Sequence, residues 1–220
     1  MIPVAIISTK QTEKALPLQC EAWSKVWPGW VQYLRPCVYS STPQPGEMFL
    51  PHYRWKTLDN PSFGYAIRWI SESVASPFLL LMDDYIPMEV HASALIEAYG
   101  LACANRGIKQ LRLLPCPGGT RLAKNIPLSY IHEIDPSAAY SLSFQAALWS
   151  GMFLREFVKE KDSPWAAEIE GSKRYARSIL EYRSCAYDVN VLSYENLYRH
   201  GKLQEAALLN CINRGLTWDG

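Results

Sequence analysis

A short apolar run that ends on two adjacent aspartates is the feature that most constrains this 220-residue chain. The apolar residues 78–82 follow Pro77 and lead directly into Asp83 and Asp84. A run of this length is too short for a helix of its own and suits a buried strand. Buried strands of parallel sheets read as continuous apolar segments, and ligands bind at their carboxyl ends. The sequence therefore predicts that the two carboxylates lie at a ligand-binding edge of an α/β sheet.

The paired carboxylates are candidate metal ligands. Two adjacent negative charges repel each other, so a fold that keeps them together usually uses them to bind a cation. Hard oxygen ligands suit Mg²⁺ or Mn²⁺, and substrate phosphates often supply the remaining ligands. A solvated acidic turn after the strand is the alternative interpretation.

The overall composition excludes several classes of protein. A net charge of +1 gives no general attraction to nucleic acid or anionic membranes. The six cysteines and four histidines are scattered without close pairs, which argues against a zinc site and favours free thiols in a reducing compartment. No apolar stretch is long enough to span a bilayer, and the amino-terminal residues do not resemble a signal peptide. We therefore expect a cytoplasmic protein.

Strand-like and helix-like segments alternate along the chain. The expected strands are residues 3–7, 36–40, 76–82 and 110–114, followed by 129–134 and 139–143. The expected helices are residues 12–33 (ended or interrupted at Pro28 and Gly29), 63–74, 91–105, 146–160, 166–180 and 203–214. Residues 41–51, rich in Pro, Ser, Thr and Gly, are expected to form an exposed loop. This alternation predicts one α/β domain over residues 1–220, with a mostly parallel central sheet flanked by helices.

Several nucleotide-binding and catalytic motifs are missing. The sequence contains neither a GxxxxGK[ST] phosphate-binding loop nor a GxGxxG dinucleotide fingerprint. No serine lies in a GxSxG motif, so the sequence does not support an acyl-transfer nucleophile. In a parallel sheet, however, the first and third strands can be neighbours, and a nucleotide diphosphate could then lie across their carboxyl ends.

A carboxylate in the second half of the chain is the candidate general base. Pro164 suits the first turn of a helix, which places Glu168 near its beginning. A carboxylate there also interacts favourably with the helix dipole, which is the alternative explanation. Glu168 and Glu170 cannot share one face of the helix, so at most one of them is expected to face a site.

Two groups of residues resemble a known family. Residues 59–68, followed by the apolar strand and its two aspartates, resemble the nucleotide-diphospho-sugar glycosyltransferases of the GT-A fold, family-2-like. The pattern Gln145-Ala-Ala-Leu-Trp149, followed by Pro164-Trp165, resembles a small bacterial or phage branch of these proteins.

The resemblance implies a function and a set of site residues. It implies metal-assisted transfer of a sugar from a UDP- or GDP-sugar to a hydroxyl, with inversion and with Mn²⁺ or Mg²⁺ on the donor diphosphate. Residues 1–115 would bind the nucleotide sugar, and residues 116–220 would bind the acceptor, either a saccharide or a modified nucleic-acid base. The implied site residues are Ser8, Thr9, Asn60 and Arg68 for the donor, Asp83 and Asp84 for the metal, Gln145, Trp149 and Trp165 for the sugar or acceptor pocket, and Glu168 as base.

Two departures from the family pattern leave alternatives open. The chain has Met82-Asp83-Asp84 where the family has Asp-x-Asp, so either aspartate could be the metal ligand. Ala166 and Ala167 stand where the related segment has a Glu and a Phe. Because an expected acid is missing, a sugar- or nucleotide-binding protein without catalytic activity is an alternative interpretation. A nucleotidyltransferase of the same fold is a third possibility, although residues 8–11 after the first strand contain no glycine.

Overall fold

The computed structural model describes all residues except 46–49, 51, 116–118, 123–129, 180–181 and 219–220. Within this described part, nine strands form one sheet in the order β3-β2-β1-β4-β9-β6-β10-β8-β7. They are β1 (Ile2–Ile7), β2 (Leu34–Ser40), β3 (Arg54–Thr57), β4 (Phe78–Met82), β6 (Ile108–Arg112), β7 (Gly119–Leu122), β8 (Ile131–Ile134), β9 (Ala147–Trp149) and β10 (Arg183–Tyr187). The helices are α1 (Leu16–Val26), α2 (Phe63–Ser73), α3 (Ala92–Ala104), α4 (Gly151–Phe157), α5 (Pro164–Ala176) and α6 (Glu205–Asn213).

The sheet is mostly parallel, as the sequence predicts. Among its described strands, β8 and β9 run against the direction of all the others. The first and third predicted strands, β1 and β4, are parallel neighbours, with Ile7 paired to Met82. The residues that follow these two strands therefore meet at one edge of the sheet.

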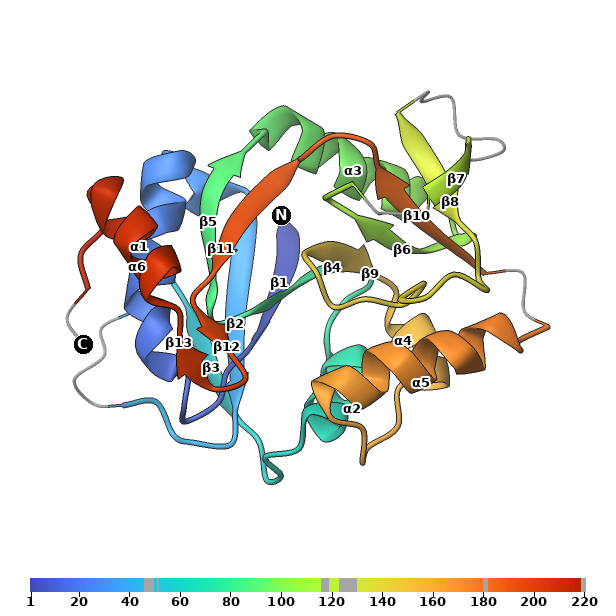
Figure 1. The fold of residues 1–220 in the computed structure, drawn as a ribbon, viewed down its shortest axis with the longest axis horizontal. Coiled ribbons are helices and arrows are strands. Elements are labelled where there is room, and N and C mark those ends of the chain that lie inside the picture. Colours follow the sequence, from blue (N-terminus) through green and yellow to red (C-terminus); the bar gives the residue numbers. More distant parts are fainter. Residues whose placement is uncertain (46–49, 51, 116–118, 123–129, 180–181, 219–220) are drawn as a thin grey trace.

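Helices cover both faces of the sheet (Figure 1). Because successive side chains of β1 point to opposite faces, Val4 and Ile6 belong to one core cluster while Ala5 and Ile7 belong to the other. The first cluster includes side chains of α1 and α3, and the second includes side chains of α2, α4 and α5. The result is a three-layer α/β/α arrangement around the predicted sheet.

The carboxyl-terminal part of the chain returns to the amino-terminal half. Asp83 and Asp84 form the turn between β4 and β5 (Tyr85–Val90), called the aspartate turn below. Strand β5 pairs with β11 (Leu192–Asn196) in an antiparallel ribbon. A short hairpin of β12 (Tyr198–Arg199) and β13 (Lys202–Leu203) follows, and α6 then packs beside α1 (Figure 1). Residues from both ends of the sequence therefore enclose the same edge of the sheet.

Two glycines allow α2 to pack tightly against the α4 region. A β-carbon at Gly64 would lie 2.0 Å from the carbonyl oxygen of Lys159, and one at Gly151 would lie 2.4 Å from that of Ser71. Both distances are far inside van der Waals contact. Only glycine therefore fits at these two crossings.

Several predicted elements differ from the structure. Residues 139–143 contain turns and bends instead of a strand, and residues 147–149 form β9 instead of the first turn of a helix. Hydrogen bonding to β4 and β6 on its two sides explains why β9 is a strand. The predicted helix 12–33 consists of α1 between two 3₁₀ turns, Glu13–Ala15 and Trp30–Gln32. Strands β3, β5, β7, β10 and β11 and the short strands Tyr198–Arg199 and Lys202–Leu203 were not predicted.

Some predictions fall partly outside the described residues. These are residues 46–49 and 51 of the predicted loop, residue 129 of a predicted strand and residue 180 of a predicted helix. None of the helices in the described part of the chain combines the length and the apolar character needed to cross a bilayer.

Candidate functional site

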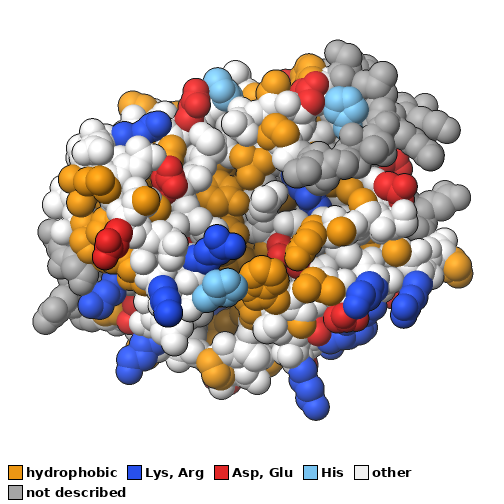
Figure 2. Space-filling model, viewed as in Figure 1, with side chains coloured by type: hydrophobic (Ala, Val, Ile, Leu, Met, Phe, Trp, Pro, Cys, Tyr) orange, Lys and Arg blue, Asp and Glu red, His pale blue; other side chains and the backbone are white. Residues whose placement is uncertain are grey.

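A cleft of about 1120 Å³ lies at the edge of the sheet where β1 and β4 end. Its walls come from these strand ends, the beginning of α2, the beginning of α5 and the returning segment 195–207. Figure 2 shows this face, on which basic side chains and a histidine lie beside hydrophobic side chains over the hairpin and the amino end of α5. Ligand sites of α/β sheets occur at this kind of edge, so this cleft is the candidate site.

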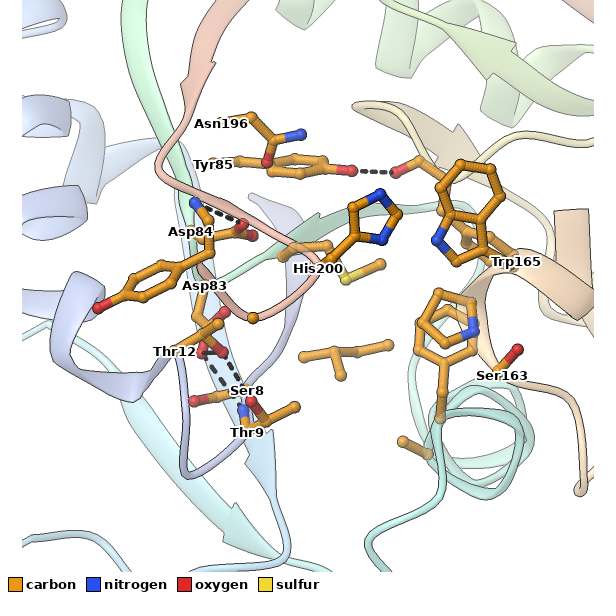
Figure 3. A pocket seen from close by; sticks show the side chains of 18 of the residues that line it. Ser8, Thr9, Thr12, Asp83, Asp84, Tyr85, Ser163, Trp165, Asn196 and His200 are labelled. Atoms are coloured by element: carbon orange, nitrogen blue, oxygen red, sulfur yellow. Dashed lines mark hydrogen bonds between the residues drawn. The ribbon is translucent and has the colours of Figure 1, made fainter. Parts of the chain in front are cut away.

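Asp83 is buried at the base of the cleft. Its Oδ2 accepts hydrogen bonds from the Thr12 hydroxyl at 2.7 Å and from the Thr9 main-chain N–H at 3.3 Å (Figure 3). Burial raises the pKa of Asp83 to about 7, the neighbouring Asp84 adds to this rise, and the Thr12 hydrogen bond opposes it. The β1–α1 connection therefore fixes this carboxyl in place.

Asp84 points toward the returning segment instead. The main-chain N–H of Tyr198 donates to its Oδ2 at 3.3 Å, and the N–H of Leu197 donates to its carbonyl oxygen at 3.0 Å (Figure 3). Burial raises the pKa of Asp84 to about 6, against the lowering effect of the Tyr198 hydrogen bond. Asp84 thus joins the end of β4 to the hairpin.

The buried side chain of Gln19 holds the aspartate turn from below. Its Nε2 donates to the carbonyl oxygens of Met82 at 2.8 Å, Tyr85 at 3.0 Å and Asp83 at 3.2 Å. Since α1 carries Gln19, the turn cannot shift without moving that helix. The sequence did not predict this role, because a single polar residue within a helix carries no distinguishing pattern.

The two aspartates fit a divalent cation. Both carboxyls are desolvated in the metal-free protein, and a cation would stabilise both ionised forms. In the described residues, no group of three or more His, Cys, Asp or Glu side chains could hold a metal by itself. The remaining ligands would therefore come from water and from oxygens of a bound ligand, as Mg²⁺ prefers.

Glu168 lines the opposite side of the cleft, at the beginning of α5. Ser163 caps this helix by accepting from the N–H of Ala166 at 3.2 Å, and Pro164 occupies its first turn as expected. The Oε1 of Glu168 accepts hydrogen bonds from the Ser143 hydroxyl at 2.8 Å and the Phe144 N–H at 2.7 Å. Of the two candidate glutamates, Glu168 is therefore the one that faces the cleft.

Glu170 has a different environment. Its side chain is half exposed, and its Oε1 accepts a hydrogen bond from the Lys173 ammonium at 2.6 Å. This salt bridge lies outside the residues that line the cleft. The expectation that only one of the two glutamates faces a site agrees with this geometry.

An aromatic pair spans the mouth of the cleft. The Trp165 ring, 51% exposed, stacks on the His200 ring with centroids 5.5 Å apart and planes 11° apart (Figure 3). His200 and Gly201 form the two-residue turn of the β12–β13 hairpin, both with positive φ. This hairpin was not predicted from the sequence, although a Gly in the second position of a two-residue turn is a recognisable signal.

Seven of the ten predicted site residues line the cleft together. They are Ser8, Thr9, Asn60, Asp83, Asp84, Trp165 and Glu168. The cleft also contains residues that were not predicted, among them Tyr198, Arg199 and His200 of the hairpin. The hairpin lies more than a hundred residues beyond the aspartates, and no local pattern indicates that it returns to them.

Three predicted residues lie elsewhere. Trp149 is fully buried in β9, where it stacks on Phe144 in the hydrophobic core, so it cannot contact a ligand in the cleft. Arg68 is on α2 and lies 4.0 Å from the Glu160 carboxylate, outside the cleft lining. Gln145 is half-buried just before β9 and also does not line the cleft. The structure therefore does not bring these three side chains together with the other seven.

Comparison with known proteins identifies the fold. No protein-family model and no curated protein matches the sequence. Among solved structures, TarS 1–349 from S. aureus in complex with UDP-GlcNAc has a TM-score of 0.57 and 13% identity, with 94% of this chain and 61% of that chain covered. This chain thus spans about three-fifths of the TarS fragment.

Two other solved structures match over nearly their whole length. The UTP-bound UGPase from Acinetobacter baumannii has a TM-score of 0.54 and 10% identity, with 98% of this chain and 94% of that chain covered. HddC from Yersinia pseudotuberculosis has a TM-score of 0.55 and 11% identity, with 97% and 100% covered. The similarities confirm the predicted GT-A-like fold.

Proposed function

We propose that this chain is a metal-assisted glycosyltransferase that moves a sugar from a UDP- or GDP-sugar to a hydroxyl group, with inversion at the anomeric carbon. One observation carries this proposal: Asp83, Asp84 and Glu168 lie on one cleft at the carboxyl edge of β1 and β4. Carboxylates for a metal and a separate carboxylate for a base are what a direct displacement requires. The likeness to a TarS fragment in complex with UDP-GlcNAc supports the class of donor.

The donor would lie along the edge where β1 and β4 end. Ser8, Thr9 and Asn60 line this part of the cleft and would contact the nucleotide. Asp84, with Asp83, would hold Mn²⁺ or Mg²⁺, which when bound neutralises charge on the leaving diphosphate. Because two donors already engage Oδ2 of Asp83 and one engages Oδ2 of Asp84, we assign Asp84 as the principal ligand.

The acceptor would bind on the α5 side. Ser143 and Phe144 hold Oε1 of Glu168, so Oε2 is the atom that would take the proton from the acceptor hydroxyl. The acceptor oxygen would attack the anomeric carbon as the bond to the nucleoside diphosphate breaks. The exposed ring of Trp165 offers a flat apolar face for a sugar. A saccharide is therefore the acceptor that we propose, with a modified nucleic-acid base as the alternative.

Calorimetry and donor turnover test the assignment of the base. We would measure binding of UDP-N-acetylglucosamine, UDP-glucose and GDP-mannose with and without Mn²⁺, and the release of nucleoside diphosphate from each. Glu168→Gln should lower turnover about 10²–10⁴-fold and leave donor affinity unchanged. Glu170→Gln is the matched control and should behave like the parent protein, because Glu170 lies outside the cleft. Turnover at the parental rate in Glu168→Gln would show that another group is the base.

The same assays test the metal ligand. Asp84→Asn should abolish the increase in donor affinity that Mn²⁺ gives the parent protein, because the neutral amide binds a divalent cation far more weakly. Equal Mn²⁺ dependence in the parent and in Asp84→Asn would exclude this role for Asp84.

A nucleotidyltransferase that makes the nucleotide sugar is the second candidate. The coverage of the matched structures favours this candidate, since this chain covers 94% of UGPase but only 61% of the TarS fragment. The absence of glycine in residues 8–11 argues against it. Release of pyrophosphate from UTP or GTP in the presence of a sugar 1-phosphate would support it. Donor binding with neither reaction would instead indicate a non-catalytic binding protein.

A further inference from the structure

The irregular segment 141–144, just before β9, is held firmly between the sheet and α5. Gln110 of β6 donates from Nε2 to the carbonyl oxygen of Ser143 at 2.9 Å. Ser184 of β10 donates to Oε1 of Gln110 at 2.8 Å and is also 3.1 Å from the carbonyl oxygen of Ser141. Gln110, Ser141 and Ser184 are all fully buried. The carbonyl groups of Ser141 and Ser143 are thus both bonded to buried side chains of the sheet, which makes the segment a fixed support.

This support makes the two hydrogen bonds that orient Glu168. The Ser143 hydroxyl and the Phe144 N–H both donate to Oε1, at 2.8 and 2.7 Å. From the other direction, Ser172 of α5 lies 3.0 Å from the N–H of Leu142, so the helix that carries Glu168 is also bonded to the segment. Two donors on one carboxylate oxygen fix the rotamer of Glu168 and direct its second oxygen.

The main chain of Phe144 also reaches the aspartate turn. Tyr85, which directly follows Asp84, donates from its hydroxyl to the carbonyl oxygen of Phe144 at 3.2 Å (Figure 3). The Tyr85 ring is held in turn by stacking on Tyr194, with centroids 4.2 Å apart and planes 14° apart. Phe144 therefore bonds to Glu168 through its N–H and to Tyr85 through its carbonyl group.

We infer that Ser143 and Tyr85 are positioning residues that set the distance between Glu168 and the aspartate turn through the main chain of Phe144. This inference rests on the proposed function, in which the two sites act on the same donor and acceptor. The physical reason is that a displacement needs its base and its leaving-group ligands in one fixed geometry, and a misplacement of about 1 Å lowers a rate about 10²-fold. Neither side chain needs to touch the substrate to have this effect.

Single variants measure the effect of each hydrogen bond. Turnover would be followed as release of nucleoside diphosphate, with Mn²⁺, from whichever of UDP-N-acetylglucosamine, UDP-glucose and GDP-mannose binds best. Ser143→Ala and Tyr85→Phe should each lower kcat about 10–100-fold while the donor Kd stays within about twofold. Ser143→Thr keeps the hydroxyl and should recover most of the loss. Tyr33→Phe, which changes an exposed tyrosine, is the control for loss of a phenol group and should have no effect.

A double-mutant cycle separates positioning from a general structural defect. If Ser143 acts through Glu168, Ser143→Ala should have little further effect on kcat in a Glu168→Gln background. Full additivity of the two losses, or a parental kcat in Ser143→Ala and Tyr85→Phe, would overturn the inference while leaving the proposed function intact. Absence of turnover in the parent protein with all three donors would overturn both. Thermal unfolding of each variant would identify any loss that comes from misfolding.

Discussion

Trp165 and His200 stack across the mouth of the cleft, with ring centroids 5.5 Å apart. Trp165 lies in the first turn of α5, whereas His200 lies at the tip of the β12–β13 hairpin. The pair therefore connects the α5 side of the cleft to the segment that is hydrogen-bonded to Asp84. It holds in place a hairpin that has only two residues in each strand.

Loss of this stack should loosen the hairpin. An aromatic pair contributes about 0.5–1.5 kcal/mol beyond its burial, so Trp165→Ala should speed amide exchange in residues 198–203 about 2–10-fold. Hydrogen exchange followed by mass spectrometry measures this directly. Ile169→Ala, which shortens another exposed apolar side chain of α5, is the control. Unchanged exchange in Trp165→Ala would mean that other contacts suffice to hold the hairpin.

The stability of the metal-free protein should fall between pH 5 and pH 8. The pKa of Asp83 is about 7 in the folded protein and about 3.9 when unfolded, so the folded state binds more protons within this range. Stability is therefore lost as the pH rises toward the folded pKa. Asp83→Asn should make the decrease in the free energy of unfolding between pH 5 and pH 8 smaller by roughly 2–3 kcal/mol.

Urea unfolding at the two pH values measures this difference. Asp188→Asn, which changes an exposed aspartate, should leave the decrease in place. An identical pH dependence in the parent protein and in Asp83→Asn would show that Asp83 does not titrate in this range.

The crossing of α2 with the segment after α4 should not tolerate a methyl group. Gly64→Ala would place its β-carbon 2.0 Å from the carbonyl oxygen of Lys159, and main-chain atoms cannot easily move away. We expect a loss of about 1–3 kcal/mol or more in the free energy of unfolding. Gly100→Ala is the matched control, because it lies in α3 with nothing within 4 Å of the added carbon. It should stabilise the protein by about 0.5–1 kcal/mol, and a similar result for Gly64→Ala would contradict the packing described above.

The sequence was sufficient to predict the aspartate edge of the cleft. A strand buried on both faces must be apolar along its whole length, so residues 78–82 and the charges that follow them are visible without any structure. The pairing of β1 with β4 then brings Ser8, Thr9 and Asp83 together, as expected. The position of Glu168 near the start of a helix could also be predicted from the sequence, because Pro164 marks the first turn.

The remaining parts depend on contacts that no local pattern encodes. Residues 147–149 are a strand because β4 and β6 bond to them on both sides, and that pairing is what buries Trp149 in the core. Strand β10 mixes Arg, Ser, Cys, Ala and Tyr, and so lacks both strand alternation and a continuous apolar run. The hairpin and the residue before it reach Asp84 through long-range hydrogen bonds from the N–H groups of Tyr198 and Leu197.

The return of residues 192–207 to the edge formed by β1 and β4 also has a consequence for biosynthesis. The floor of the cleft is encoded by residues 1–84, but the wall that is hydrogen-bonded to Asp84 emerges from the ribosome more than a hundred residues later. A nascent polypeptide that stops short of β11 would expose the carboxyl pair to water and lack the enclosing wall. Ligand capture should therefore begin only after residues 192–207 have been translated.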